Sequence, residues 1–162
     1  MHLQGENLAP TSLYTRIRRK TLVFYIEYPA TFKDYFRLKN TSEFIKKNPF
    51  YKKSSDGLLK TNIQNLEILL TPLLLSINFL PESILYRLLL NYNEKLIANR
   101  IKKVLKKYQI TEFVFINSFN IYYPNIGKLI PSNLNVYHCV DPLIVGFDMK
   151  HGIKSEKIIL KK

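Results

Sequence analysis

Three short runs of apolar, β-branched and aromatic residues constrain the fold more than any other feature of the sequence. They are Leu22–Glu27, Phe113–Ile116 and Leu134–Val140. The first two runs are apolar at successive positions, which is typical of strands buried on both faces in a parallel sheet that helices cover. The third run alternates more between apolar and polar residues, as a strand nearer the edge of a sheet does.

A long helix is expected between the first and second strands. Apolar residues recur there at spacings of three and four, which predicts one apolar helix face with a break near Asn91–Asn93. The residues of this face are Ile84, Leu85, Leu88, Leu89, Tyr92, Leu96, Ile97, Ile101, Val104, Leu105 and Tyr108. The opposite face carries Lys95, Arg100, Lys102, Lys103, Lys106 and Lys107. We interpret the basic face as a solvated surface, because no aromatic residues interleave with its cations as they do in nucleic-acid binding sites.

The most apolar segment of the chain is Leu66–Pro81. It predicts a buried strand over Leu66–Leu70, followed by a loop that packs under the helices. An exposed apolar loop that dips into a membrane surface is the alternative. Pro72, Ser76 and Asn78 interrupt any regular amphipathic helix, which favours the buried loop.

The order of these elements is strand, helix, strand, short crossover and strand. This order predicts an α/β fold with an open, mainly parallel sheet flanked by helices, in one domain spanning residues 1–162. The polar segment Lys39–Lys60 is expected to be a surface excursion that ends in the turn Ser55–Gly57.

Polar residues follow each of the three predicted strands, where ligands of open α/β sheets bind. They are Glu27 and Tyr28, then Asn117, Ser118 and Asn120, and then Asp141. Each of them is also an ordinary helix cap or turn residue, but three polar strand ends together predict a cleft.

The charge of the chain points to an anionic partner. There are 25 Lys+Arg against 12 Asp+Glu, a formal net charge of +13, which suits a nucleic acid, a phospholipid surface or a phosphorylated small molecule. A genome rich in A and T would also produce many lysines.

One cysteine, Cys139, excludes an intramolecular disulfide. The lack of a signal-peptide core or a long apolar span favours a cytoplasmic location, including the inner face of the membrane.

The C-terminal part of the chain, Asn135–Glu156, is similar to a segment of bacterial glycosyltransferases with the GT-B fold, of the group 1 type that builds surface polysaccharides. In that family a strand ends in an aspartate, here Asp141. An apolar stretch, a His-Gly pair (His151–Gly152) and a glutamate that opens a helix (Glu156) follow. Further upstream, Val23–Pro29 resembles the family's strand that ends in an acidic residue and proline. The resemblance covers roughly residue 7 to the end of the chain.

This resemblance implies a Rossmann-like, acceptor-side N-terminal domain. It would take part in sugar transfer from a nucleotide-sugar donor to a surface-glycan or lipid-linked acceptor. The implied catalytic residues are Asp141 and His151. The implied substrate-binding residues are Glu27, Tyr28, Asn117, Ser118, Asn120, Asp148 and Glu156. For Asp148 and Glu156 the alternative is electrostatics at a helix end, and for His151 it is packing of the loop.

The family's second domain binds the donor, and we expect it to lie outside this chain. No cofactor or metal is therefore expected within the 162 residues, and the isolated chain is expected not to transfer sugar. Two alternatives remain: a basic nucleic-acid-binding module, and an interaction domain without catalysis that pairs with a separate donor domain.

Overall fold

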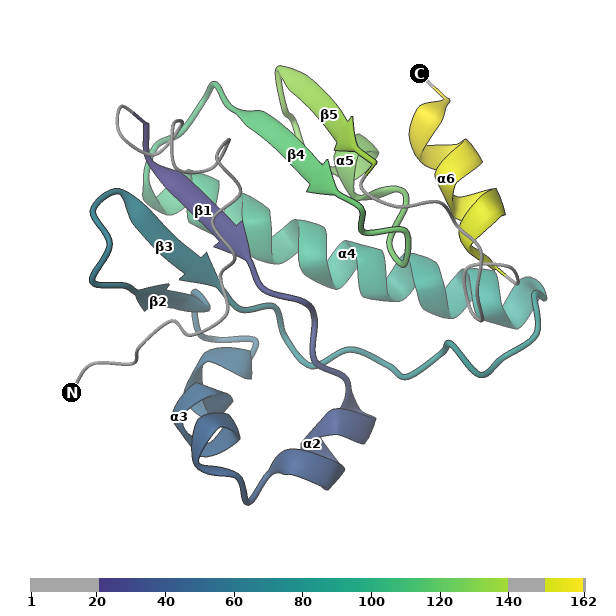
Figure 1. Cartoon of the computed structure of the whole chain (residues 1–162), viewed down its shortest axis with the longest axis horizontal. Coiled ribbons are helices and arrows are strands. Elements are labelled where there is room, and N and C mark those ends of the chain that lie inside the picture. Colours follow the sequence, from purple (N-terminus) through teal and green to yellow (C-terminus); the bar gives the residue numbers. More distant parts are fainter. Residues whose placement is uncertain (1–20, 140–150, 162) are drawn as a thin grey trace. The chain divides into compact units, whose positions relative to one another are not determined.

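The protein is described by a computed structural model over residues 21–139 and 151–161, shown in Figure 1. The chain divides into two compact units, Met1–Leu73 (unit 1) and Leu74–Lys162 (unit 2). Both units combine helices with a small sheet that contains a parallel strand pairing, so the predicted α/β class is confirmed at this level. The expectation of one open, mainly parallel sheet is wrong for the described residues, because their strands form two separate sheets, one of which includes an antiparallel pairing. The assignment of residues 1–162 to one domain stays a prediction.

Unit 1 contains a three-stranded sheet and two short helices. Its elements are β1 (Val23–Ile26), α2 (Phe32–Leu38), α3 (Ser42–Tyr51), β2 (Leu58–Lys60) and β3 (Leu66–Leu69). The strand order is β1-β3-β2, with β1 parallel and β2 antiparallel to β3. The strands expected in Leu22–Glu27 and Leu66–Leu70 are confirmed. Tyr25 of β1 is 38% exposed, so the expected burial on both faces is wrong for β1.

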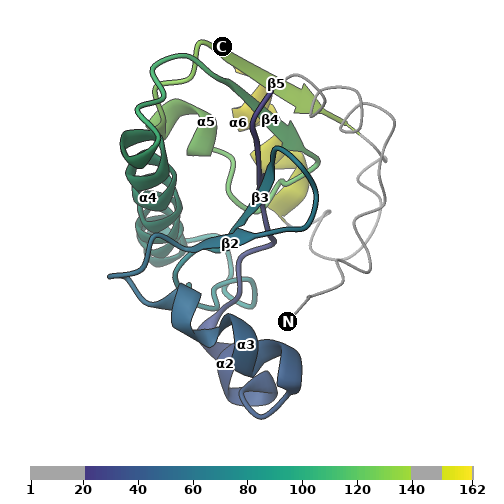
Figure 2. The same ribbon diagram turned by 90° about the vertical axis from the view of Figure 1, so that its left-hand side faces the viewer.

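Helix α3 lies within Lys39–Lys60, the segment that the sequence predicts to be a surface excursion, and helix α2 directly precedes this segment (Figure 2). Thr31 begins α2 with a capping box, in which its hydroxyl accepts from the Asp34 amide and its own amide donates to the Asp34 carboxylate. Thr41 begins α3 by accepting from the amide of Phe44. The expectation of a mere surface excursion over Lys39–Lys60 is therefore wrong, because α3 and β2 form within it.

The core of unit 1 is built on Phe44, Tyr51 and Leu70, all less than 9% exposed. The rings of Phe44 and Tyr51 lie 5.1 Å apart. Partly buried apolar residues pack against this cluster, namely Ala30, Tyr35, Leu38, Phe50, Ile68 and Leu73. Burial also raises the pKa of the Tyr51 phenol to about 12.

Unit 2 is organised along one long helix. Its elements are α4 (Ile84–Lys107), β4 (Val114–Ser118), α5 (Ile126–Leu129), β5 (Leu134–His138) and α6 (Ile153–Leu160). Strands β4 and β5 are parallel, with Val114 opposite Leu134 and Ser118 opposite His138, which confirms that the second and third expected strands form. The expected burial of the second strand on both faces is wrong, since Val114 is 53% exposed. Helix α5 packs next to α4, as Figure 2 also shows.

Helix α4 runs without the break expected near Asn91–Asn93. The Asn93 side chain is fully buried and makes two 3.0 Å hydrogen bonds to the backbone of Leu75, one as acceptor and one as donor. This asparagine satisfies the backbone of the preceding segment and leaves the helix intact. The helix ends after Lys107, where Gln109 takes the left-handed conformation (φ 54°) that commonly closes helices.

The expected apolar face of α4 is wrong in its N-terminal half. Ile84 is 78% exposed and Leu88 is 61% exposed, whereas the buried face there is formed by Tyr86, Leu90 and Glu94. The apolar repeat thus changes from one side of the helix to the other near its middle. Arg100, which the sequence places on the solvated basic face, is buried. The buried residues of α4 are Tyr86, Leu90, Asn93, Glu94, Ile97, Ala98, Arg100, Ile101 and Val104.

The segment after β3 is mostly buried, as the core interpretation of Leu66–Pro81 predicts. Leu74 is 0% and Ile77 3% exposed, although Phe79 near its end is 74% exposed. Among the described residues, no helix has the length and apolar character that crossing a membrane requires.

Candidate functional site

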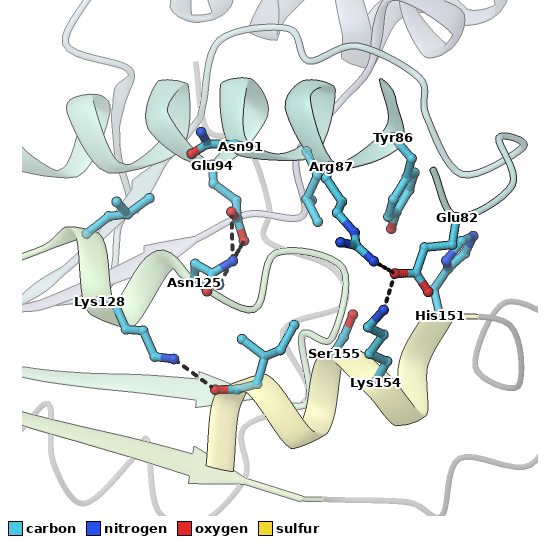
Figure 3. A pocket seen from close by; sticks show the side chains of 13 residues that line it. Glu82, Tyr86, Arg87, Asn91, Glu94, Asn125, Lys128, His151, Lys154 and Ser155 are labelled. Atoms are coloured by element: carbon cyan, nitrogen blue, oxygen red, sulfur yellow. Dashed lines mark hydrogen bonds and ion pairs between the residues drawn. The ribbon is translucent and has the colours of Figure 1, made fainter. Parts of the chain in front are cut away.

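A pocket of about 620 Å³ lies within unit 2, between α4, the start of α5 and α6 (Figure 3). Most of its lining side chains are polar or charged, and the same site contains two aromatic rings. The lining residues are Glu82, Tyr86, Arg87, Leu90, Asn91, Glu94, Asn125, Lys128, Leu129, His151, Lys154, Ser155 and Ile158.

One end of the pocket is formed by Glu94 and Asn125 (Figure 3). Glu94 is 1% exposed, and its Oε1 accepts from the backbone amide of Asn125 at 2.7 Å. The Asn125 side-chain amide donates to both carboxylate oxygens, at 3.2 and 3.1 Å. Burial raises the pKa of Glu94, and the hydrogen bonds from Asn125 and the charge of Lys128 offset this only in part. Glu94 therefore binds its proton more tightly than an exposed carboxyl group does.

The other end of the pocket is a cluster of charges at the start of α4. Arg87 donates to Glu82 Oε1 at 2.8 Å, and the Lys154 ammonium on α6 contacts the same oxygen. These contacts hold the pKa of Glu82 below its ordinary value. Both cations remain more than half exposed, so they are accessible to a ligand from the solvent.

His151 is buried next to this charge cluster, at 3% exposure. Its ring stacks on Tyr86, with centroids 4.5 Å apart and an interplanar angle of 12°. Its Nε2 lies 3.3 Å from the carbonyl oxygen of Leu80. Because a carbonyl can only accept, this contact is a hydrogen bond when Nε2 carries a proton. Of the two predicted catalytic residues, His151 lines the pocket, and Asp141 lies outside the described residues.

Glu156 lies on α6 but does not line the pocket. Its carboxylate accepts from the Tyr137 hydroxyl at 2.9 Å, which connects α6 to β5. Burial and this hydrogen bond raise the pKa of Tyr137. The contact gives Glu156 a structural role, while its predicted role in substrate binding stays a prediction.

Asn117, Ser118 and Asn120 lie at the carboxyl end of β4. Asn117 and Asn120 bond to each other, with the Asn120 amide donating to Asn117 Oδ1 at 2.8 Å and the Asn117 amide group donating to the Asn120 carbonyl at 3.0 Å. The Ser118 hydroxyl lies 3.3 Å from Nδ1 of His138, at the end of the neighbouring strand. The cleft expected from three polar strand ends stays a prediction, because β1 lies in a different sheet from β4 and Asp141 lies outside the described residues. The two asparagines stabilise the turn that follows β4.

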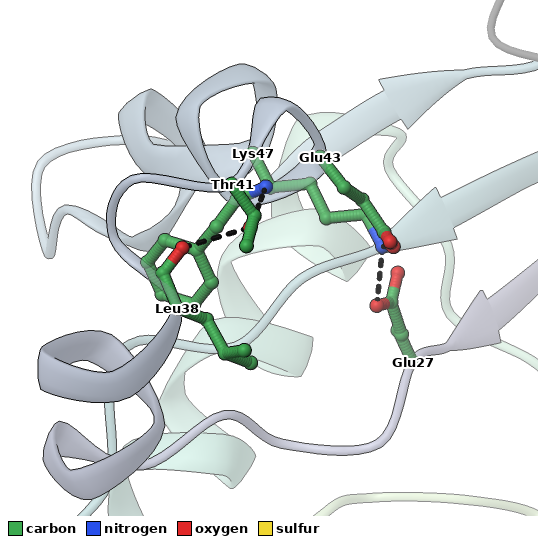
Figure 4. A network of polar contacts seen from close by, with 6 residues as sticks. Glu27, Leu38, Thr41, Glu43 and Lys47 are labelled. Carbon is green, nitrogen blue, oxygen red and sulfur yellow. Dashed lines mark hydrogen bonds and ion pairs between the residues drawn. The ribbon is translucent and has the colours of Figure 1, made fainter.

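Glu27 and Tyr28 lie in unit 1, after β1. Glu27 accepts from Lys47 at 2.7 Å, and the same ammonium contacts Glu43 at 2.7 Å, so Lys47 bridges the end of β1 and helix α3 (Figure 4). Burial lowers the pKa of Lys47, but its hydrogen bonds to both carboxylates outweigh this and raise it overall. Tyr28 is 57% exposed. Glu27 thus has a structural role here, and binding of a substrate by either residue stays a prediction.

Asp141 and Asp148 lie outside the described residues, so their roles also stay predictions. The pocket contains residues that sequence reasoning missed, chiefly Glu94 and Asn125. Glu94 is the one acidic residue in α4, but the sequence did not show that it lies on the buried face, because that face was assigned to the other side of the first turns. A lone carboxylate on the buried face of a helix is a recognisable mark of a site.

The pocket combines a mainly apolar exposed surface with a few polar groups and exposed cations, which suits a ligand that has both an apolar and an anionic part. Carboxylates and amides bind hydroxyl groups, and the exposed cations bind phosphate or carboxylate. Within residues 21–139 and 151–161, no three His, Cys, Asp or Glu side chains are grouped so that they could hold a metal ion.

Comparison of the chain with protein families, with curated proteins and with solved structures finds no match.

Proposed function

We propose that this chain is the Rossmann-like acceptor-side part of a GT-B glycosyltransferase, and that its pocket in unit 2 binds a phosphate-bearing glycosyl acceptor. The observation that carries this proposal is the position of His151. The sequence resemblance implies a catalytic role for this residue, and its ring forms the wall of a pocket that also contains Glu94 and two accessible cations.

The two ends of the pocket fit the two chemical parts of such an acceptor. Asn91 and Asn125 offer amide groups to sugar hydroxyls, and the buried Glu94 holds Asn125 in place through its hydrogen bonds. Arg87 and Lys154 offer positive charge to the phosphate of a lipid-linked sugar. Glycosyl transfer requires an acceptor hydroxyl that is held in place and deprotonated while it attacks the donor. In the proposed enzyme, His151 or Asp141 takes that proton, and the pocket holds the acceptor.

Ligand binding by the purified chain tests this proposal without requiring turnover. The probes are a short-chain prenyl-diphosphate-linked monosaccharide, the free monosaccharide and the prenyl diphosphate alone, titrated by calorimetry or ligand-observed NMR. We expect the diphosphate-linked sugar to bind most tightly. Lys154→Ala should weaken its binding roughly tenfold, because a charge-assisted contact to phosphate is lost.

The matched control is Lys157→Ala, on the same helix but outside the pocket, which should leave binding unchanged. Glu94→Gln should weaken binding of both sugar-containing probes and spare the prenyl diphosphate. If none of the three probes binds, or if Lys157→Ala weakens binding as much as Lys154→Ala, the pocket is not an acceptor site.

A further inference from the structure

One exposed face of α4 changes character along the helix. At its N-terminal end this face is apolar, with Ile84 78%, Leu85 55%, Leu88 61% and Tyr92 44% exposed. Towards the C-terminus the same face is cationic. Its exposed lysines are Lys95, Lys102, Lys103 and Lys106.

Helical geometry places these residues together. Ile84, Leu88, Lys95, Lys102 and Lys106 follow one another at spacings of four and seven residues, which keeps them on one side of a helix with 3.6 residues per turn. They form one continuous stripe, and the residues buried in unit 2, such as Ile97 and Val104, lie on the other side of α4.

The stripe carries no negative charge. The one carboxylate of α4, Glu94, is 1% exposed and lies on the buried face. Just before the helix, Phe79 adds a further exposed apolar side chain at 74%. A run of apolar side chains that continues into exposed lysines is complementary to a surface with both an apolar layer and negative headgroups.

We propose that this stripe docks the protein on an anionic lipid bilayer. The end at Ile84 and Leu88 enters the boundary between headgroups and acyl chains, and the lysines lie over the anionic headgroups. A nucleic acid would use the lysines but has no need of the apolar end, so the observations favour a lipid surface. This inference goes beyond the proposed function and does not depend on it, since the stripe lies outside the pocket.

Vesicle co-sedimentation of the full chain tests the proposal. The vesicles are pure phosphatidylcholine, and phosphatidylcholine with about one third phosphatidylglycerol. We expect binding to the anionic vesicles, weakened roughly tenfold or more both by Ile84→Gln/Leu88→Gln, which removes apolar contact, and by Lys102→Glu/Lys106→Glu, which reverses charge. Binding to pure phosphatidylcholine should be at least tenfold weaker.

Matched controls separate the stripe from general properties of the chain. Lys39→Glu/Lys46→Glu changes the net charge by the same amount at exposed positions of unit 1, and Ile45→Gln/Leu160→Gln removes two apolar side chains that are 58% and 62% exposed elsewhere. Both control variants should bind anionic vesicles within about twofold of the wild type. Circular dichroism confirms that every variant is folded.

Three results would overturn the proposal. The first is equal binding by the stripe variants and the controls. The second is binding to a labelled oligonucleotide, without vesicle binding, that the lysine variant abolishes and the apolar variant leaves intact, which would assign the stripe to nucleic acid. The third is loss of self-association in Ile84→Gln/Leu88→Gln without any vesicle binding by the wild type, which would assign it to a second copy of the chain.

Discussion

The interiors of the two units differ in chemistry. Unit 1 closes around aromatic and aliphatic side chains, and its main charge network, formed by Lys47 with Glu27 and Glu43, lies near the surface. Unit 2 buries Asn93, Glu94 and His151 to 3% exposure or less. Burying a polar group costs free energy unless it is hydrogen-bonded. Unit 2 therefore combines an apolar core, which includes Leu74, Ile97 and Ile121, with buried polar side chains that line a pocket, whereas the core cluster of unit 1 is aromatic and aliphatic.

Two carboxylates, Glu43 in unit 1 and Glu94 in unit 2, are held in opposite ways. In unit 1, the salt bridges to Lys47 lower the pKa of Glu43. In unit 2, Glu94 is held by amide hydrogens and its pKa is raised by burial. The first arrangement favours a permanent charge, and the second favours a group that exchanges a proton. Four measurements probe this contrast.

The largest effect is expected in the core of unit 1. Phe44→Ala should lower the free energy of unfolding by about 3–5 kcal/mol, because the cavity left beside Tyr51 cannot close fully. Urea denaturation measures this, with Ile45→Ala as the control, since Ile45 is 58% exposed and its truncation should cost about 0.5 kcal/mol or less. Equal losses in the two variants would show that Phe44 is not a core residue.

The next effect concerns the buried amide of unit 2. Asn93→Ala should cost about 2 kcal/mol, because it removes both hydrogen bonds to the Leu75 backbone and leaves that amide and carbonyl buried. The exposed neighbour Asn99 on the same helix provides the control variant, Asn99→Ala. A loss in Asn93→Ala no greater than in the control would mean that the polar contact does not stabilise unit 2.

The pH dependence of stability should separate the two kinds of carboxylate. The pKa of Glu94 is higher in the folded than in the unfolded chain, so its stabilising contribution is complete below its ordinary value of 4.5 and is lost as the pH rises through the raised value. The unfolding free energy of the wild type minus that of Glu94→Gln should therefore decrease as the pH rises from 4 to 7. The fall is about 1.4 kcal/mol for each unit by which the pKa is raised. A difference that is constant or grows with pH would contradict this sign.

The smallest effect is expected for the surface network. A double-mutant cycle with Glu27→Gln and Lys47→Met should give a coupling of about 0.5–1 kcal/mol, reduced in 1 M salt, because both side chains are less than a third exposed. The pair Asp34 and Arg37 is the control. With the Arg37 side chain 68% exposed, its coupling should be close to zero. A larger coupling for Asp34 and Arg37 than for Glu27 and Lys47 would contradict this prediction.

Much of the fold could be predicted from local sequence. The strands β1, β4 and β5 and the extent of α4 follow from composition and periodicity over short windows, and the structure confirms them. The buried face of α4 could not be predicted in this way, because both sides of its first turns are apolar and the sequence alone does not say which side the rest of unit 2 covers. For the same reason Arg100 was placed on a solvated face although it is buried.

The candidate site was less predictable than the fold. His151 was found through a resemblance, and the structure then placed it against Tyr86 and near Glu82 and Lys154. Glu94 and Asn125 are in contact although they are 31 residues apart in the chain, and no spacing pattern in the sequence predicts such a contact. The polar residues after β4 were expected in a cleft, but two of them bond to each other to form a turn.

By itself the sequence determined the α/β class, the positive charge and the positions of most strands and of the long helix, because these follow from side-chain chemistry and from interactions between near neighbours. Tertiary contacts select which face of α4 is buried, pair the Asn93 side chain with the Leu75 backbone, and bring Glu94 and His151 to one pocket. Those outcomes depend on contacts between segments far apart in the chain, and a local sequence pattern does not determine the free energy of such contacts.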